Sequence, residues 1–254
     1  MIFRLLLLFY VFPIFLQECI IVDKPFECDD MIQILEYHND LRSKVAQGRT
    51  KLFEAKDMWA LKWDDALAVM AQDWANKCTL KPNTGRPNDC GENIAWLSLT
   101  EVQPIDVEAI IEMWYDEINK FDPEIKGIQG GTEHFTQLIW GETQFIGCGS
   151  TIFQDKEDSK VYQALVVCNY KPAGNFVNKR LYELLDKNHI DEETGEPVRC
   201  EKGIPSSRHP GLCAHDIGHA LGTYVPCSRY GDNVQPTAYF WIALLLCGYI
   251  NVFF

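Results

Sequence analysis

The spacing of apolar residues along the first half of the chain predicts three helices. Asp29 and Asp30 can cap the first, which ends near Gly48 and has apolar positions at helical spacing: Met31, Ile34, Leu35, His38, Leu41 and Val45. The second helix is expected to begin around Asp64, and one of its faces carries Leu67, Met70, Ala71, Trp74 and Cys78. The third opens at Asp106 and continues through Val107, Ile110, Ile111, Trp114, Ile118 and Phe121.

The following part of the chain predicts strands. Three runs, rich in β-branched or aromatic residues, cover 135–140, 145–153 and 161–168. A charged segment, 154–160, is expected to join the last two as a hairpin-type loop. Helices followed by strands favour an α+β fold over a parallel α/β fold. Residues 28–182 are enough for one well-buried core.

The chain changes character beyond this core. Residues 183–237 are charged and turn-rich and contain three cysteines, which predicts a disulfide-stapled extension that cannot build a core of its own. Residues 238–254 form an apolar tail without a charge. Because no Lys or Arg follows it, three interpretations stay open: a glycolipid-anchor signal that is cut off, a short membrane span, or an irregular tail.

The amino terminus predicts secretion. Arg4 precedes an apolar run from Leu5 to Leu16, as in a signal peptide, and the run is too short to span a bilayer. We expect a signal peptide within residues 1–21, cleaved between Gln17 and Val22. The formal net charge of −13 argues against nucleic acid as a partner and against electrostatic attachment to anionic lipid. A membrane would be reached only through a C-terminal anchor.

Ten cysteines fit an oxidising compartment. Cys19 lies near the expected cleavage site and Cys247 lies in the apolar tail. The remaining even set favours disulfides over reactive thiols, although composition fixes no pairing. These disulfide candidates are Cys28, Cys78, Cys90, Cys148, Cys168, Cys200, Cys213 and Cys227.

Four motifs in a fixed order carry a family resemblance. They are His38-Asn39-x-x-Arg42, Gly91-Glu92-Asn93-Ile94, the segment from Glu133 to Trp140 (EHFTQLIW) and the segment from Cys168 to Asn175 (CNYKPAGN). Together they resemble the superfamily of cysteine-rich secretory proteins, venom antigen-five proteins and plant pathogenesis-related proteins (the CAP superfamily), with the venom allergen-like members nearest. The resemblance implies a three-layer α-β-α sandwich with a small antiparallel sheet between helices. It also implies a disulfide between Cys78 and Cys148.

The resemblance further implies a cavity in which two histidines and two acidic side chains bind a metal. Three of these residues are present, as Glu92, Glu117 and His134. The second histidine is replaced by Pro82, which cannot ligate through its side chain. One nitrogen and two oxygens make a weak zinc site, so we expect no cofactor. Glu92 and Glu117 are instead expected to bond the backbone and His134 in a polar cavity.

Other polar residues are interpreted as scaffold. His38 and Arg42 share a helix face, and Asn39 and Asn93 are expected to bond the backbone. The segment from His215 to His219 (HDIGH) imitates the H-E-x-x-H zinc signature. However, Asp is shorter than Glu, and Gly218 disfavours a helix. We therefore expect no metal there.

No G-x-S-x-G elbow and no nucleophile–base pair emerges from these motifs. The sequence therefore predicts a secreted or surface-tethered, non-enzymatic CAP-domain protein that binds an extracellular protein or a lipid or sterol. The alternative is a divalent-metal-dependent hydrolase that uses Glu92, Glu117 and His134. In sterol-binding relatives the relevant loop corresponds to residues 121–131, which here hold one aromatic residue and three glycines.

Overall fold

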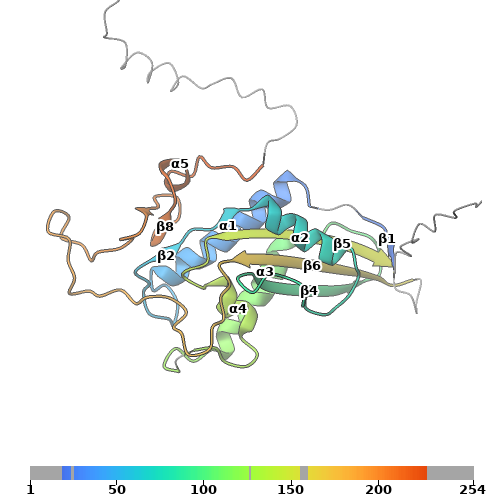
Figure 1. Ribbon diagram of the computed structural model, residues 1–254, viewed down its shortest axis with the longest axis horizontal. Coiled ribbons are helices and arrows are strands. Elements are labelled where there is room, and N and C mark those ends of the chain that lie inside the picture. Colours follow the sequence, from blue (N-terminus) through green and yellow to red (C-terminus); the bar gives the residue numbers. More distant parts are fainter. Residues whose placement is uncertain (1–18, 24–25, 126, 155–159, 228–254) are drawn as a thin grey trace, which may run out of the picture.

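A mainly antiparallel sheet forms the middle of the molecule (Figure 1). The structure is a computed structural model that describes residues 19–23, 26–125, 127–154 and 160–227. The apolar tail and nearly all of the expected signal peptide lie outside these residues. The elements are β1 (Ile20–Ile21), α1 (Cys28–Ala46), β2 (Met58–Trp59), β3 (Lys62–Trp63), α2 (Asp65–Ala75), β4 (Gly91–Leu99), α3 (Val107–Tyr115), the 3-10 helix η1 (Asp116–Lys120), α4 (Glu133–Leu138), β5 (Phe145–Gln154), β6 (Tyr162–Lys171), β7 (Ile204–Pro205), β8 (Leu212–Ala214) and α5 (Ile217–Ala220).

The central sheet has the strand order β1-β5-β6-β4, with all three of these pairings antiparallel. The short strand β3 pairs in parallel with the start of β5. In the register of the central pair, Cys148 on β5 lies opposite Cys168 on β6. A second, smaller sheet has the order β2-β8-β7 and joins the extension to the core.

Helices cover both faces of the central sheet, which confirms the predicted three-layer α-β-α sandwich. Helix α2 lies directly on β5, because a Cβ at Gly147 would lie only 2.2 Å from the backbone nitrogen of Ala68. In Figure 1, α2 lies above the sheet and α4 lies below it, and α3 packs against α4. On this second face, His38 of α1 contacts Tyr170 of β6 through a 3.0 Å hydrogen bond.

Local capping explains where the helices begin. Asp64 accepts from the backbone N–H of Leu67, and Asp106 does the same for Ala109, so both predicted starts are confirmed. At α1 the N-cap residue is Glu27. Its backbone N–H donates to the side-chain carboxylate of Asp30, as in a capping box. Helix α3 ends earlier than predicted and continues as η1, which therefore carries Glu117.

Two secondary-structure predictions differ from the structure. The strand predicted over 135–140 is wrong, because most of that segment forms helix α4. Its fully buried residues Phe135, Leu138 and Ile139 follow helical spacing and pack in the main core. The segment that begins at Gly91 is a nine-residue strand, β4, which the sequence did not predict.

The disulfides correct several expectations. Among the residues that the structure describes, the pairs are Cys19–Cys78, Cys28–Cys227, Cys148–Cys168 and Cys200–Cys213, and the buried Cys90 has no disulfide partner. The expected Cys78–Cys148 pair is wrong, because Cys148 lies beside Cys168 on adjacent strands, with a Cα–Cα distance of 4.1 Å. Cys19 is bonded rather than set aside, so cleavage within the expected range has to fall before Cys19 for this disulfide to exist.

The extension packs against the sandwich instead of forming a separate module. Strand β8 pairs in parallel with β2, and Cys227 bonds to Cys28 at the start of α1. Arg208 forms a 2.6 Å ion pair with Glu36 on α1. His209, whose Nε2 lies 3.4 Å from the Glu36 carboxylate, and Arg208 together lower the pKa of Glu36 to about 2. The extension is therefore stabilised by its contacts with the core.

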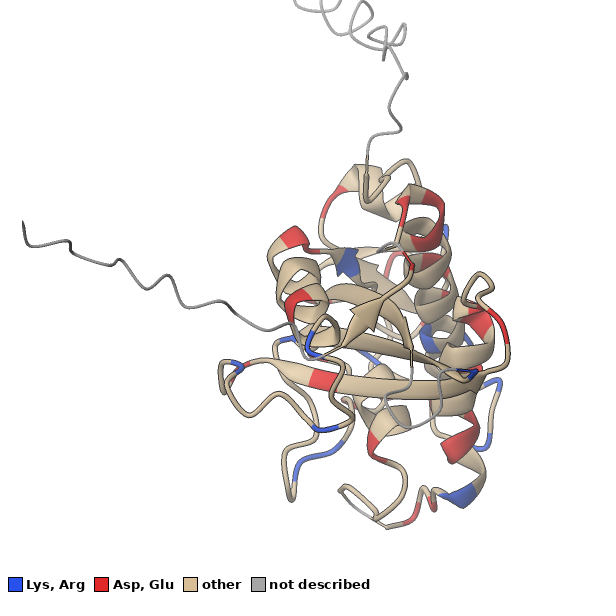
Figure 2. Ribbon diagram, turned by 90° about the vertical axis from the view of Figure 1, so that its right-hand side faces the viewer, with Lys and Arg blue, Asp and Glu red and all other residues tan. Residues whose placement is uncertain are grey.

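Charged residues are spread over several helices and loops in Figure 2, with acidic and basic positions interspersed. Within the described part of the chain, the structure contains no helix with the length and apolar character needed to cross a membrane.

Candidate functional site

His134 and Glu117 form a close pair at the start of α4. Nδ1 of His134 lies 2.7 Å from Oε1 of Glu117. Oε2 of Glu117 accepts the backbone N–H groups of His134 and Phe135, both at 3.0 Å. The carboxylate therefore satisfies two N–H groups that the first turn of α4 leaves without an internal partner. The His134 ring also stacks on Trp114, with centroids 6.2 Å apart.

Glu92 lies at the start of β4 and turns to a different set of partners. Its Oε1 accepts the backbone N–H of Asn83 at 2.9 Å and lies 3.3 Å from Nη1 of Arg86. Its Oε2 is buried and has no hydrogen-bond partner among the described residues. Burial raises the pKa of Glu92, and the Asn83 N–H and the Arg86 charge oppose that rise. Arg86 therefore supplies the positive charge that faces the Glu92 carboxylate.

This arrangement does not fit the metal site that the resemblance implies. Pro82 adjoins Asn83, so the missing histidine would have stood close to the Glu92 carboxylate. Arg86 places a cation against one of the expected oxygen ligands, and both oxygens of Glu117 are engaged. Across the residues that the structure describes, no group of three or more His, Cys, Asp or Glu side chains is placed to hold a metal ion.

Arg42 is part of the scaffold. The guanidinium is fully buried and donates to four backbone carbonyls, those of Trp59, Leu138, Trp140 and Thr143. Burial lowers its pKa to about 9. These bonds tie α1 to the chain around α4, so Arg42 organises the core.

His38, Asn39 and Asn93 have the scaffold roles that the sequence predicts. His38 bonds the carbonyl of Ile34 and the Tyr170 hydroxyl, and burial lowers its pKa to about 4. Asn39 exchanges two hydrogen bonds with the backbone of Leu61. Asn93 donates to the carbonyl of His134 and to the Tyr170 hydroxyl.

The two histidines of the HDIGH segment also serve packing. His215 stacks on Trp59 and Phe145, with centroids 4.7 and 5.4 Å away. His219 is buried and bonds the carbonyl of Leu61 at 3.2 Å, while Asp216 caps the short helix α5. Burial lowers the pKa of His219 to about 4. The segment thereby holds the extension against the core.

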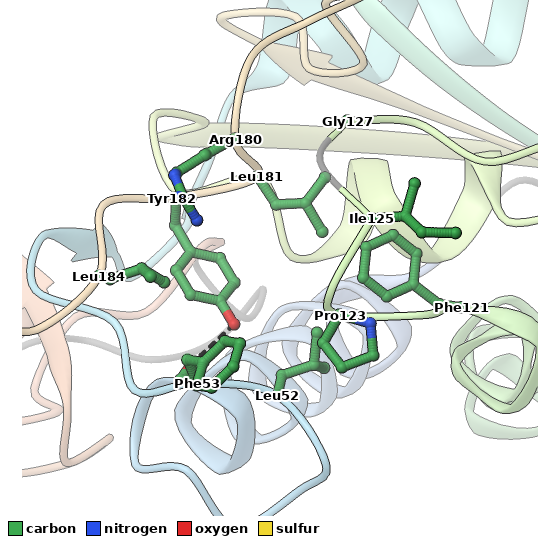
Figure 3. Close-up of a pocket in the computed structure, with 10 residues that line it drawn as sticks. All are labelled: Leu52, Phe53, Phe121, Pro123, Ile125, Gly127, Arg180, Leu181, Tyr182 and Leu184. Atoms are coloured by element: carbon green, nitrogen blue, oxygen red, sulfur yellow. Dashed lines mark hydrogen bonds between the residues drawn. The ribbon is translucent and has the colours of Figure 1, made fainter.

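A small pocket lined mainly by apolar side chains, called the apolar pocket below, opens on the surface beside the loop that follows η1 (Figure 3). Its volume is about 40 Å³, and it is lined by Leu52, Phe53, Phe121, Pro123, Ile125, Gly127, Arg180, Leu181, Tyr182 and Leu184. Sequence reasoning identified only the 121–127 part. The signal for the rest was the presence of two apolar pairs, Leu52-Phe53 and Leu181-Tyr182, in otherwise charged stretches.

Next to it lies a larger hollow, which we call the charged pocket, of about 220 Å³. It shares Arg180, Leu181 and Tyr182 with the apolar pocket. Its other lining residues are Asp57, Trp59, Trp140, Gly141, Glu142, Lys179, Glu183 and Lys202. Charged side chains from the core and from the extension therefore meet beside the partly exposed Trp59, whereas Trp140 is buried beneath the hollow's lining.

Comparisons with known proteins agree with the motifs and the sandwich. Residues 35–170, more than half of the chain, match the family described as the cysteine-rich secretory protein family (CAP). The chain belongs to this family. It is 37% identical to Venom allergen 5 of Vespula flavopilosa over 163 residues, 59% of this chain and 78% of that protein. It is 36% identical to Venom allergen 5 of Tityus serrulatus over 216 residues, 78% of this chain and 50% of that protein.

Solved structures of CAP proteins share the fold. BmVAL-1 matches with a TM-score of 0.58 at 25% identity, over 76% of this chain and all of that one. The crystal structure of NaASP2 with Zn²⁺ matches with a TM-score of 0.50 at 28% identity, over 71% of this chain and 93% of that one. Family membership and the four disulfides of the described residues fit an extracellular CAP-domain protein.

Proposed function

We propose that this CAP-domain protein is a secreted or surface-tethered, non-enzymatic protein that recognises an extracellular protein through the apolar pocket. The supporting observation is that three large apolar side chains at this pocket stay exposed. Phe53, Ile125 and Leu184 are 49%, 55% and 38% exposed. Large apolar side chains gathered at one hollow mark an interaction surface, whereas single scattered ones do not.

The size of the pocket favours a protein partner over a sterol or another lipid. Sites that enclose small molecules typically measure roughly 300–1,000 Å³. The apolar pocket, at about 40 Å³, is far smaller than that. A protein partner can insert one side chain there and contact Phe53, Ile125 and Leu184 around it, as anchors do at protein interfaces.

The hydrolase alternative has less support. Glu92 is paired with Arg86, whereas His134 is paired with Glu117, so the three residues do not present free ligands to one metal. NaASP2, to which the chain is similar, has been crystallised with Zn²⁺. In the present chain, Pro82 and Arg86 disfavour zinc binding. We therefore propose that Glu92, Glu117 and His134 have a structural role.

Binding can be tested by selecting a displayed library of random peptides on the folded, disulfide-bonded protein. We expect the selected peptides to lose at least tenfold in affinity for Ile125→Asp. Val69→Asp is the matched control, because Val69 is 61% exposed on α2, away from the pocket lining. Equal binding to both variants would contradict the proposal. Micromolar binding of cholesterol or palmitate that Ile125→Asp abolishes would replace the protein partner with a lipid.

Secretion and tethering can be tested by intact mass on protein expressed in secretory cells. We expect an amino terminus at Glu18 or Cys19, which removes the signal peptide but keeps Cys19. A form released from cells by a phosphatidylinositol-specific phospholipase, without residues 238–254, would support the lipid anchor. A soluble product that retains the complete tail would contradict both anchoring interpretations.

A further inference from the structure

Arg180 stands at the boundary of the two pockets. Its side chain is exposed and lines both the apolar pocket and the charged pocket. Within the described residues, its guanidinium has neither an ion pair nor a hydrogen bond. The neighbouring cations of the charged pocket are paired, Lys179 with Glu142 at 3.8 Å and Lys202 with Glu183 at 3.6 Å. An unpaired guanidinium is notable in a chain with a net charge of −13.

The wall shared by the pockets is held in place from behind. The carbonyl of Leu181 accepts the backbone N–H of Gly141 at 2.8 Å. The Tyr182 hydroxyl donates to the carbonyl of Phe53 at 2.8 Å, as the dashed line in Figure 3 shows. A Cβ at Gly141 would lie 2.7 Å from Cβ of Tyr182, so these segments approach each other closely. A surface fixed in this way loses little conformational entropy when a ligand binds.

The adjacent chemistry defines the ligand. A guanidinium binds a carboxylate through two parallel hydrogen bonds, and the neighbouring apolar pocket takes a small apolar group. The carboxy-terminal residue of a polypeptide offers both on a single Cα atom. The preceding residues of such a chain would then cross the charged pocket, where the partly exposed Trp59 can contact an extended peptide.

We propose that Arg180 and the two pockets bind the carboxy terminus of an extracellular polypeptide that ends in an apolar residue. This inference rests on the proposed function and specifies its partner. The free carboxylate pairs with Arg180, the last side chain enters the apolar pocket beside Ile125, and the preceding backbone lies over Trp59. A fatty acid carries the same two groups, but its chain does not fit a volume of about 40 Å³.

The test uses fluorescein-labelled octapeptides of glycine and serine that end in leucine, with either a free carboxylate or an amide. Fluorescence anisotropy on the full disulfide-bonded protein is expected to give at least tenfold tighter binding for the free acid. Arg180→Glu is expected to remove that preference. Lys77→Glu carries the same charge change on a residue that lines neither pocket, and it is expected to keep the preference.

The outcomes separate this inference from the proposed function. Equal binding of acid and amide, unchanged by Arg180→Glu, would overturn the carboxylate site. If peptides from the random library still lose affinity for Ile125→Asp in that case, protein recognition at the pocket stands. If Ile125→Asp changes neither kind of peptide, both fail. Palmitate is the competing ligand. If palmitate displaces the free-acid peptide, and its affinity falls more in Arg180→Glu than the affinity of the peptide does, the inference is overturned in favour of a fatty acid.

Discussion

The backbone N–H of Asn83 donates to Oε1 of Glu92 across 2.9 Å. This bond places Pro82, the preceding residue, beside the carboxylate that relatives are expected to use for metal. Arg86 lies 3.3 Å from the same oxygen. Loss of an imidazole and presence of a guanidinium act in the same direction, because both lower the affinity of the site for a divalent cation.

We therefore predict that Pro82→His combined with Arg86→Ala creates zinc binding. The double variant supplies a nitrogen ligand and removes the competing charge, so saturating zinc should raise its melting temperature by several degrees. Arg86→Ala alone is the control and should respond much less. The measurement is thermal unfolding with and without zinc, together with metal content after dialysis. Stoichiometric zinc in the wild-type protein, lost in His134→Ala, would contradict the structural role given to His134.

Local signals in the sequence were sufficient for much of the sandwich. Asp64 and Asp106 begin helices because their side chains reach an N–H three residues later, which depends on nearby sequence only. Strands β5 and β6 were readable from β-branched and aromatic residues, whereas β4 was not predicted. Helix α4 was not, because a short apolar run fits either period, and here the packing of Phe135 and Leu138 in the core decides.

Long-range relationships could not be predicted from the sequence in the same way. Cys148 pairs with Cys168 because two strands bring them opposite each other, and Cys78 meets Cys19 through the edge strand β1. The two pockets combine segments that are distant in sequence, so the sequence alone could not show that these segments meet. Glu117 and His134 were identified by resemblance, but their mutual hydrogen bond needed the structure.

Replacing Arg42 should strongly destabilise the fold. Arg42→Met keeps most of the side-chain volume but leaves the buried carbonyls of Trp59, Leu138, Trp140 and Thr143 without their donor. We expect a loss of about 3–5 kcal/mol in the free energy of unfolding, measured by urea titration. Arg49→Met is the control, because Arg49 is exposed at the end of the α1 region. A loss below about 1 kcal/mol would show that water or the backbone replaces the guanidinium.

Acid should destabilise the protein through two buried histidines. The pKa values of His38 and His219 are lowered to about 4, because burial disfavours their charged forms. A histidine whose pKa is lowered by folding contributes its full stability at pH values above its unfolded pKa of about 6.5. That stability is lost as pH falls toward 4. Each contributes at most about 3 kcal/mol. His219→Gln should flatten the fall in unfolding free energy between pH 6.5 and 4, whereas the exposed His189→Gln should not. Identical slopes for all three proteins would contradict this assignment.

Removing the disulfide between Cys28 and Cys227 should cost more stability than removing the one between Cys200 and Cys213. The first joins residues 199 apart, whereas the second joins residues 13 apart, so the first restricts the unfolded chain more. Chain entropy gives about 5 and about 3 kcal/mol for the two. The comparison is urea unfolding of the two double Cys→Ser variants, each of which leaves Cys90 as it is. Without the Cys28 bond, the extension should also be cut first by trypsin, since its other contacts to α1 include the exposed Arg208 pair with Glu36. Equal losses in the two variants would show that the extension is held by its packing on β2 and α1, with the covalent link adding little.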